Sequence, residues 1–284
     1  MYEQFRVRNE NLFRQEKNRA LDKAADIIMG TKEVVRTGFE AFDHLGGGFG
    51  RGELVLLGAR PGIGKTAMAL QMAEYNAVRY HIPVFYISLQ KSTCSVMKRL
   101  LHLMTGIDDD EDLIDDEAND LFQRAYTKIK EAQLYVRYCD NPTMLHIAHE
   151  MSFCSDIPKL VIVDEIGVPY MSKKESLRIV KEMRKLAEAT DATVLILSNT
   201  SCLVDERKDH MPVLADFPVP VRMADAVIRM YREDYYNPEP SYEAYDPTHF
   251  FYEDWNGCFG ERINMNYDFV AGRFVHVESS RELK

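Results

Sequence analysis

The segment from Ala59 to Thr66 has the residue types and spacing of a loop that binds phosphate groups. It reads Ala-Arg-Pro-Gly-Ile-Gly-Lys-Thr. Gly62 and Gly64 let the backbone turn so that successive N–H groups face one anion, and a helix N-terminus reinforces them. Lys65 brings positive charge to the outer phosphates, and the Thr66 hydroxyl can bind Mg²⁺. The sequence therefore predicts a site for ATP and Mg²⁺. The residues expected at the nucleotide are Arg60, Pro61, Gly62, Ile63, Gly64, Lys65, Thr66 and Ala67.

A carboxylate at the end of a buried strand is the second expected part of this site. The apolar run 160–163 is followed directly by Asp164. Ligands of parallel sheets gather at the carboxyl ends of the strands, so Asp164 is placed to bind Mg²⁺ or its water. Taken alone, Asp164 could simply end the strand, and the loop could be a glycine turn with an exposed lysine. The pairing of the two motifs favours a metal site with Thr66 and Asp164 as ligands.

The elements that must position these residues follow an alternating order. Short apolar runs at 54–57, 84–87, 160–163 and 194–197 are typical of parallel strands buried on both faces. The helical patterns between them cover 65–79, 93–104, a stretch that ends near 131, 144–153 and 175–189. This alternation predicts an α/β fold, with a mostly parallel sheet flanked by helices.

The last third of the chain has a different pattern. Runs typical of strands lie at 226–231, 249–252, 263–267 and 273–277, with no helical pattern between them. Such runs predict antiparallel hairpins at one edge of the sheet.

The composition limits the class of protein. The chain has 284 residues, of which 46% are hydrophobic and 28% charged. No apolar run approaches the ~20 residues of a membrane span, and the N-terminus lacks a secretory signal. The five cysteines are scattered, which argues against a disulfide scaffold and a zinc site. We therefore expect a cytoplasmic protein without membrane contact.

The charge is unevenly distributed. A formal net charge of −10 argues against a generic basic nucleic-acid binder. Nine of the 45 acids lie between residues 108 and 120, and the remainder of the chain is close to neutral. The acidic run is most simply a solvated helix face or helix entrance.

From about residue 37 to residue 277, the chain resembles DnaB-type replicative DNA helicases. The segments that carry the resemblance, in family order, are 37–43, 59–66, 87–89, 160–164, 197–198, 224–228, 231–236 and 256–257. Such a series of matches is more specific than the phosphate loop alone.

The resemblance implies a RecA-like P-loop NTPase fold, hexameric rings with ATP sites between subunits, and single-stranded DNA in the ring channel. It also implies a role in DNA replication, with replication proteins as partners. The amphipathic pattern at 9–29 resembles the family's linker helix, which packs on the adjacent subunit; packing on its own domain is the alternative. We therefore expect a linker helix within residues 1–35 and one ATP-binding domain over 36–284. Asn199 stands where the family has a glutamine that senses the γ-phosphate.

The first departure from the family follows the second strand. The family has a glutamate there that activates the attacking water, whereas this chain has Gln90. Glutamine can position water but cannot accept its proton, and general-base catalysis is typically worth ~10²–10⁴-fold. Glu165, directly after Asp164, is a candidate substitute, because several other P-loop classes carry an acidic pair there. Alternatively, Glu165 is only a surface acid.

Two further departures concern DNA and the neighbouring subunit. Residues 216–222 replace a longer arginine-containing loop that grips DNA in the family, and two prolines there remove N–H donors. Arg222 is a candidate DNA contact or a plain surface residue. The family's arginine finger precedes the position of 256–257, where this chain has Glu253, Asp254 and Trp255. Loss of such a finger can cost ~10³-fold or more.

These patterns predict a DnaB-like ATPase that couples ATP binding and hydrolysis to translocation on single-stranded DNA, with hydrolysis weakened. Lys65, Glu165, Gln90 and Asn199 are its candidate catalytic residues. The alternative is a regulatory or scaffold relative that binds ATP without hydrolysing it and interacts with a helicase ring. A RecA-type recombinase is a third hypothesis, which the Ala-Arg-Pro start of the loop disfavours.

Overall fold

The computed structural model describes residues 34–46, 48–107, 116–167, 171–236, 248–254, 261–268 and 272–276, with isolated positions at 18, 21, 25 and 29. The chain divides into two compact units, residues 1–34 and 35–284. The helix expected at 9–29 lies mostly outside the described residues, although its four described positions are helical. The expected division into a linker helix and an ATP-binding domain stays a prediction.

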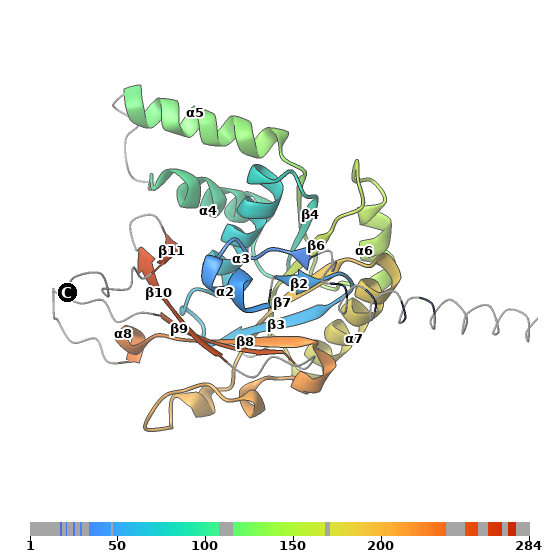
Figure 1. Ribbon diagram of the computed structural model, residues 1–284, viewed down its shortest axis with the longest axis vertical. Helices are drawn as coiled ribbons and strands as arrows, with labels where there is room; N and C mark the ends of the chain where they lie inside the picture. The colour runs from blue at the N-terminus through green and yellow to red at the C-terminus, as the bar shows by residue number, and fades with distance from the viewer. Residues whose placement is uncertain are drawn as a thin grey trace, which may run out of the picture. The chain divides into compact units, whose positions relative to one another are not determined.

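In the described part of the larger unit, a nine-stranded sheet has the order β11-β10-β9-β8-β3-β7-β6-β4-β5 (Figure 1). Its strands are β3 (Leu54–Ala59), β4 (Val84–Ser88), β5 (Leu134–Tyr138), β6 (Leu160–Ile166), β7 (Thr193–Asn199), β8 (Ala226–Tyr231), β9 (Thr248–Asp254), β10 (Glu261–Asp268) and β11 (Arg273–His276). The strands from β8 to β5 are parallel, and β9, β10 and β11 continue the sheet in antiparallel order. The predicted α/β fold with antiparallel C-terminal strands is confirmed.

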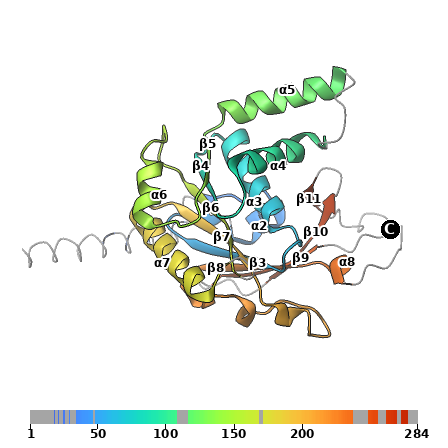
Figure 2. The ribbon, with the colours of Figure 1, turned by 180° about the vertical axis from the view of Figure 1, so that it is seen from behind.

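Helices cover both faces of the parallel strands (Figures 1 and 2). The α-helices are α2 (Glu40–Gly46), α3 (Lys65–Ala73), α4 (Thr93–Thr105), α5 (Asp116–Glu131), α6 (Met144–Met151), α7 (Lys173–Thr190) and α8 (Glu233–Tyr236). Successive residues of a strand point to opposite faces. Val55 and Leu57 therefore pack with α3 and α4, whereas Leu54 and Leu56 pack with α6 and α7. The two apolar cores hold the central strands rigidly in register.

Short elements complete the described chain. The strands β1 (Val34–Val35) and β2 (Phe49–Gly50) precede β3, and three 3₁₀ turns, η2 (Cys202–Val204), η3 (Leu214–Asp216) and η4 (Val221–Met223), lie between β7 and β8. The helix expected at 65–79 is α-helical to Ala73 and continues as the π-helical segment η1 (Glu74–Arg79). The run 108–115 lies outside the described residues, and α5 begins directly after it. None of the described helices is long and apolar enough to cross a membrane.

One close approach in the core gives a test of the fold. A Cβ added at Gly58 on β3 would lie 2.3 Å from Cζ of Phe217. We expect Gly58→Ala to lower the free energy of unfolding by about 1–3 kcal/mol, the usual penalty for overpacking a core. Urea unfolding measures it. In a Phe217→Ala background, Gly58→Ala should lower the free energy of unfolding by clearly less. Equal decreases in both backgrounds would contradict this packing.

Candidate nucleotide-binding site

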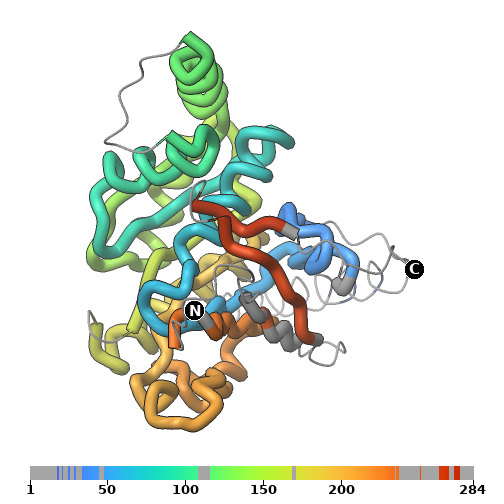
Figure 3. The backbone as a smooth tube through the Cα atoms, turned by 90° about the vertical axis from the view of Figure 1, so that its left-hand side faces the viewer, coloured from blue at the N-terminus to red at the C-terminus, as the bar shows by residue number. Residues whose placement is uncertain are grey.

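The phosphate loop connects the end of β3 to the start of α3. Gly62 and Gly64 have φ angles of 85° and 122°, a region that disfavours side chains. A Cβ at Gly64 would also lie 2.7 Å from Cζ of Phe274 on β11. The ring of Phe274 on β11, drawn in red in Figure 3, therefore packs against the loop, and the Gln71 side chain of α3 holds this strand there. Gln71 Nε2 donates to the carbonyl oxygen of Phe274 (2.8 Å), and Gln71 Oε1 accepts from its N–H (2.7 Å).

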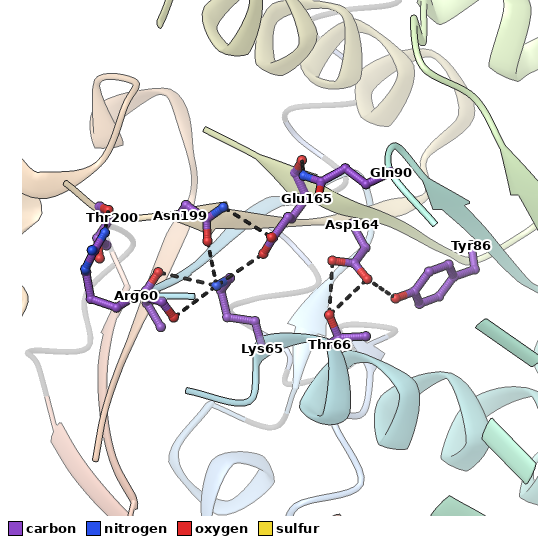
Figure 4. A network of polar contacts seen from close by, with 10 residues as sticks. Arg60, Lys65, Thr66, Tyr86, Gln90, Asp164, Glu165, Asn199 and Thr200 are labelled. Carbon is purple, nitrogen blue, oxygen red and sulfur yellow. Dashed lines mark hydrogen bonds and ion pairs between the residues drawn. The ribbon is translucent and has the colours of Figure 1, made fainter. Parts of the chain in front are cut away.

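Lys65, the first residue of α3, is buried and surrounded by oxygen atoms (Figure 4). Its Nζ donates to Oδ1 of Asn199 at 2.9 Å and lies 3.2 Å from Oε2 of Glu165. Weaker contacts reach the carbonyl oxygens of Ala59 at 3.4 Å and Arg60 at 3.3 Å. Burial lowers the pKa of Lys65, and the nearby Glu165 carboxylate offsets part of this effect. The ammonium group is thus held at the base of the loop.

Asp164 joins the phosphate loop to the centre of the sheet. The Thr66 hydroxyl donates to its carboxylate at 3.1 Å, and the buried Tyr86 hydroxyl donates to Oδ2 at 2.6 Å (Figure 4). Burial raises the pKa of Asp164, while the hydrogen bonds from Tyr86 and Thr66 act in the opposite direction. The carboxylate and the hydroxyl present oxygen atoms at one point, which is the ligand type that Mg²⁺ prefers.

Glu165 lies on β6, Asn199 ends β7, and Gln90 follows the end of β4. In the sheet β6 lies between β7 and β4, so the carboxyl ends of these strands meet at one edge. Asn199 Nδ2 donates to Oε1 of Glu165 at 3.1 Å, and Gln90 Nε2 lies 3.4 Å from the carbonyl oxygen of Glu165 (Figure 4). Glu165 is therefore part of the site and contacts both Lys65 and Asn199.

A cavity of about 340 Å³ opens at this edge of the sheet. The residues expected from the sequence that line it are Pro61, Gly62, Gly64, Lys65, Thr66, Gln90, Asp164 and Glu165. Asn199 stands behind Lys65 and contacts it directly. In its described lining, the cavity thus combines a turn rich in N–H donors with the Lys65 ammonium group and the carboxylates of Asp164 and Glu165.

Four residues named from the sequence are placed differently. The Arg60 guanidinium turns to the Asp205 carboxylate at 2.7 Å and to the Thr200 carbonyl oxygen at 3.0 Å, and is not part of the cavity lining. The side chains of Ile63 and Ala67 are buried in the core. For these three residues the backbone is the part that can face a ligand. Arg222 is exposed on η4, on the wall of a separate apolar groove.

Sequence reasoning missed several residues of the cavity. Ser88, Lys91, Arg99, Arg232 and Tyr267 also line it. The guanidinium of the buried Arg232 lies 5.4 Å from the centre of the Tyr267 ring, a cation–π contact between β10 and the segment after β8. Arg232 belongs to the segment 231–236, which carried the family resemblance, so the sequence contained a signal that could have identified it as a site residue. Arg99 and Tyr267 stand in no motif, and only the fold reveals them.

The buried carboxylate gives a prediction for stability. A carboxyl pKa raised on folding means that the folded state binds the proton more tightly than the unfolded state. The Asp164 contribution to stability is therefore least favourable at neutral pH and improves as the pH falls. We expect Asp164→Asn to raise the thermal midpoint of the nucleotide-free protein at pH 7, because its amide oxygen can still accept from Tyr86. The gain should shrink on acidification; a lower midpoint for the variant at pH 7 would refute this reasoning.

Comparisons with known proteins show which proteins the chain is similar to. The family model of the DnaB-like helicase C terminal domain matches residues 34–268. The replicative DNA helicase DnaB of Treponema pallidum is 26% identical over 211 residues, covering 70% of this chain and 48% of the relative. A probable plasmid replicative DNA helicase of Chlamydia psittaci is 28% identical over 220 residues, covering 72% and 47%. The chain thus spans about half the length of these relatives.

Solved structures show the same fold. A DnaB-like replicative helicase, studied for its interactions with primase, superposes with a TM-score of 0.78 at 22% identity, over 92% of this chain and 67% of that one. A second solved structure, of an ATPase domain, gives a TM-score of 0.79 at 21% identity, over 92% and 98%. The RecA-like fold expected from the sequence is confirmed. Because the family match extends over most of its length, the chain belongs to the family of DnaB-like helicase C-terminal domains.

Proposed function

We propose that the cavity binds ATP together with Mg²⁺. The observation that carries this proposal is the contact between Thr66 and Asp164, at 3.1 Å, beside a glycine loop whose lysine is already buried at its base. Backbone N–H groups of the loop and the start of α3 suit the β- and γ-phosphates. The Lys65 ammonium group then exchanges its carbonyl contacts for phosphate oxygens. Arg232 and Tyr267 supply the cationic and aromatic surface at the wall of the cavity.

Thr66 and Asp164 fit a magnesium ion by their chemistry. Both present oxygen atoms, and the Asp164 carboxylate already accepts two hydrogen bonds that set its orientation. When bound, the ion would neutralise charge on the phosphates. Two hydrogen bonds hold the Asp164 carboxylate beside the loop. Thr66 donates one from the loop side, and Tyr86 donates the other to Oδ2 from the side of the sheet.

For hydrolysis, we propose that Glu165 acts as the general base and that Gln90 orients the attacking water. Both side chains line the cavity, and they lie close enough for the Gln90 amide to reach the Glu165 carbonyl oxygen. Glutamine has no basic site, whereas the Glu165 carboxylate can accept a proton once Lys65 moves to the phosphates. Asn199 contacts both Lys65 and Glu165, and so couples the position of the lysine to that of the base.

At the level of the whole protein, we propose an ATPase of the replicative helicase family that assembles into a ring, hexameric by resemblance, and moves on single-stranded DNA. Replication proteins are then its partners. Membership in the family supports this proposal, as do relatives that are named replicative DNA helicases. Arg222 is the residue we assign to DNA contact, because η4 presents it to solvent.

A second function is favoured by one specific observation. In the site described, Gln90 stands two residues after the end of β4, and the carboxylate of Glu165 is engaged by Lys65 at 3.2 Å. If this ion pair persisted with ATP bound, no free base would face the γ-phosphate. The protein would then be an ATP-binding scaffold or regulator of a helicase ring.

Replacement of the loop lysine tests nucleotide binding. We expect Lys65→Ala to weaken ATP affinity roughly 10- to 100-fold, because a charge-assisted contact to phosphate is worth about 1.5–3 kcal/mol. Equilibrium titration with a fluorescent ATP analogue and Mg²⁺ measures this. Lys173→Ala, an exposed lysine at the start of α7, is the matched control and should bind as the wild type does. Equal affinity in all three proteins would rule out the proposed site.

Variants of the two candidate residues separate the two functions. If Glu165 is the base, Glu165→Gln should reduce the ATPase rate by ~10²–10⁴-fold with little change in ATP affinity. Gln90→Glu should raise the rate, since it adds a carboxylate at the end of β4. Phosphate release is measured with and without single-stranded DNA. A wild type that binds ATP but shows no turnover, together with an active Gln90→Glu variant, would favour the scaffold.

A further inference from the structure

A second cavity lies away from the phosphate loop and has a cationic lining. Its volume is about 590 Å³. Its walls come from η1, the C-terminal end of α4, the second half of α5 and the first residue of β11. The residues that line it are Glu74, Val78, Arg79, His81, Leu103, Met104, Lys128 and Arg273. A volume of this size is within the usual range for small-ligand sites, about 300–1,000 Å³.

The charges of this cavity do not cancel. Among the described residues that line it, the acidic side chain is the buried Glu74, which is already bound by Nε of Arg79 at 2.8 and 3.0 Å. Toward the described residues Arg79 uses Nε alone, so its two outer nitrogen atoms remain as donors. Within the described part of the chain, the side chains of Lys128 and Arg273 make no hydrogen bond or ion pair. The cavity therefore has an excess of positive charge in a protein whose formal charge is −10.

The backbone next to Arg273 is held in place before any ligand arrives. The next residue, Phe274, is fixed by Gln71 through both its N–H and its carbonyl oxygen, at 2.7 and 2.8 Å. Its ring is buried against Phe250, with ring centres 5.3 Å apart. The backbone that presents Arg273 is thus rigid, and rigid presentation reduces the entropy lost on binding.

We propose that this cavity binds a small phosphorylated ligand. A phosphate group would be bound by the outer guanidinium nitrogens of Arg79, the Lys128 ammonium group and the Arg273 guanidinium. Guanidinium groups match the geometry of phosphate oxygens. The apolar part of the lining, Val78, Leu103 and Met104, suits an attached organic group such as a nucleoside. Free pyrophosphate offers the phosphate contacts alone, whereas a nucleoside monophosphate offers both kinds of contact.

The test uses the full chain with Lys65→Ala as background and a chelator in place of Mg²⁺, so that binding at the phosphate loop is suppressed. Pyrophosphate and AMP are titrated separately by calorimetry at low salt. We expect saturable binding of at least one of them, weakened at least about tenfold by Lys128→Gln together with Arg273→Gln. Stronger binding of AMP than of pyrophosphate would identify a nucleotide as the ligand class, and the reverse would identify an inorganic anion.

Lys130→Gln is the matched control, because Lys130 lies on the same helix but not in the cavity lining. It should leave the affinity unchanged, and thermal unfolding of each variant verifies that it folds. The proposal is overturned if neither probe binds at millimolar concentration, if the double variant binds as well as its background, or if the control loses as much affinity. It is also overturned if the double variant loses binding of single-stranded DNA while its binding of pyrophosphate and AMP is intact.

Discussion

An ammonium group buried without solvent must find oxygen partners, and the site is arranged around this requirement at Lys65. Two carbonyl oxygens of the loop, the Asn199 amide and the Glu165 carboxylate surround Nζ. Without such partners, a cation in a medium of low dielectric is strongly unfavourable. Burial still lowers the pKa of Lys65, because the oxygen partners offset only part of the desolvation. The same cation is well suited to phosphate oxygens, since it is already largely desolvated.

The apolar sheet makes this arrangement possible. Residues of β3, β6 and β7 are buried on both faces, so the strands cannot slide without exposing one of the two cores. Their carboxyl ends are therefore fixed side by side. At this edge β6 brings Asp164 and Glu165, β7 brings Asn199, and β3 leads into the phosphate loop. Tyr86 on β4 fixes the Asp164 carboxylate from inside the protein, because its buried hydroxyl donates a hydrogen bond to that carboxylate. Fixed strands, rather than the loop alone, determine the distances between the charged groups.

The acids around the site are arranged differently from those that the family resemblance implies. Gln90 stands after β4 where the family has a glutamate, and Glu165 places a carboxylate on β6, close to Lys65. The carboxylates of Asp164 and Glu165 both line the cavity. Under the proposed function, the Glu165 carboxylate competes with phosphate for the lysine, and nucleotide binding then releases the proposed base.

Features that depend on local chemistry could be predicted from the amino-acid sequence alone. The glycines at 62 and 64, the lysine and threonine that follow them, and an aspartate after an apolar run were sufficient to predict the phosphate loop and its carboxylate. Alternating strand and helix patterns predicted the sheet, because a parallel strand buried on both faces has a nearly continuous apolar sequence. Of the three residues at the expected arginine-finger departure, Glu253 and Asp254 end β9, whereas Trp255 lies outside the described part of the chain.

The residues that reach the loop from distant parts of the chain became known from the fold. Phe274 closes over Gly64, Arg232 stacks on Tyr267, and Arg60 turns away to Asp205. The sequence placed Glu165 beside Asp164 but left open whether it was a surface acid, and the fold directs it to Lys65. The cationic cavity at Arg273 likewise joins four segments that no motif connects. Spacing along the chain encodes turns and periodicity, whereas these contacts depend on how helices and strands pack across many residues of separation.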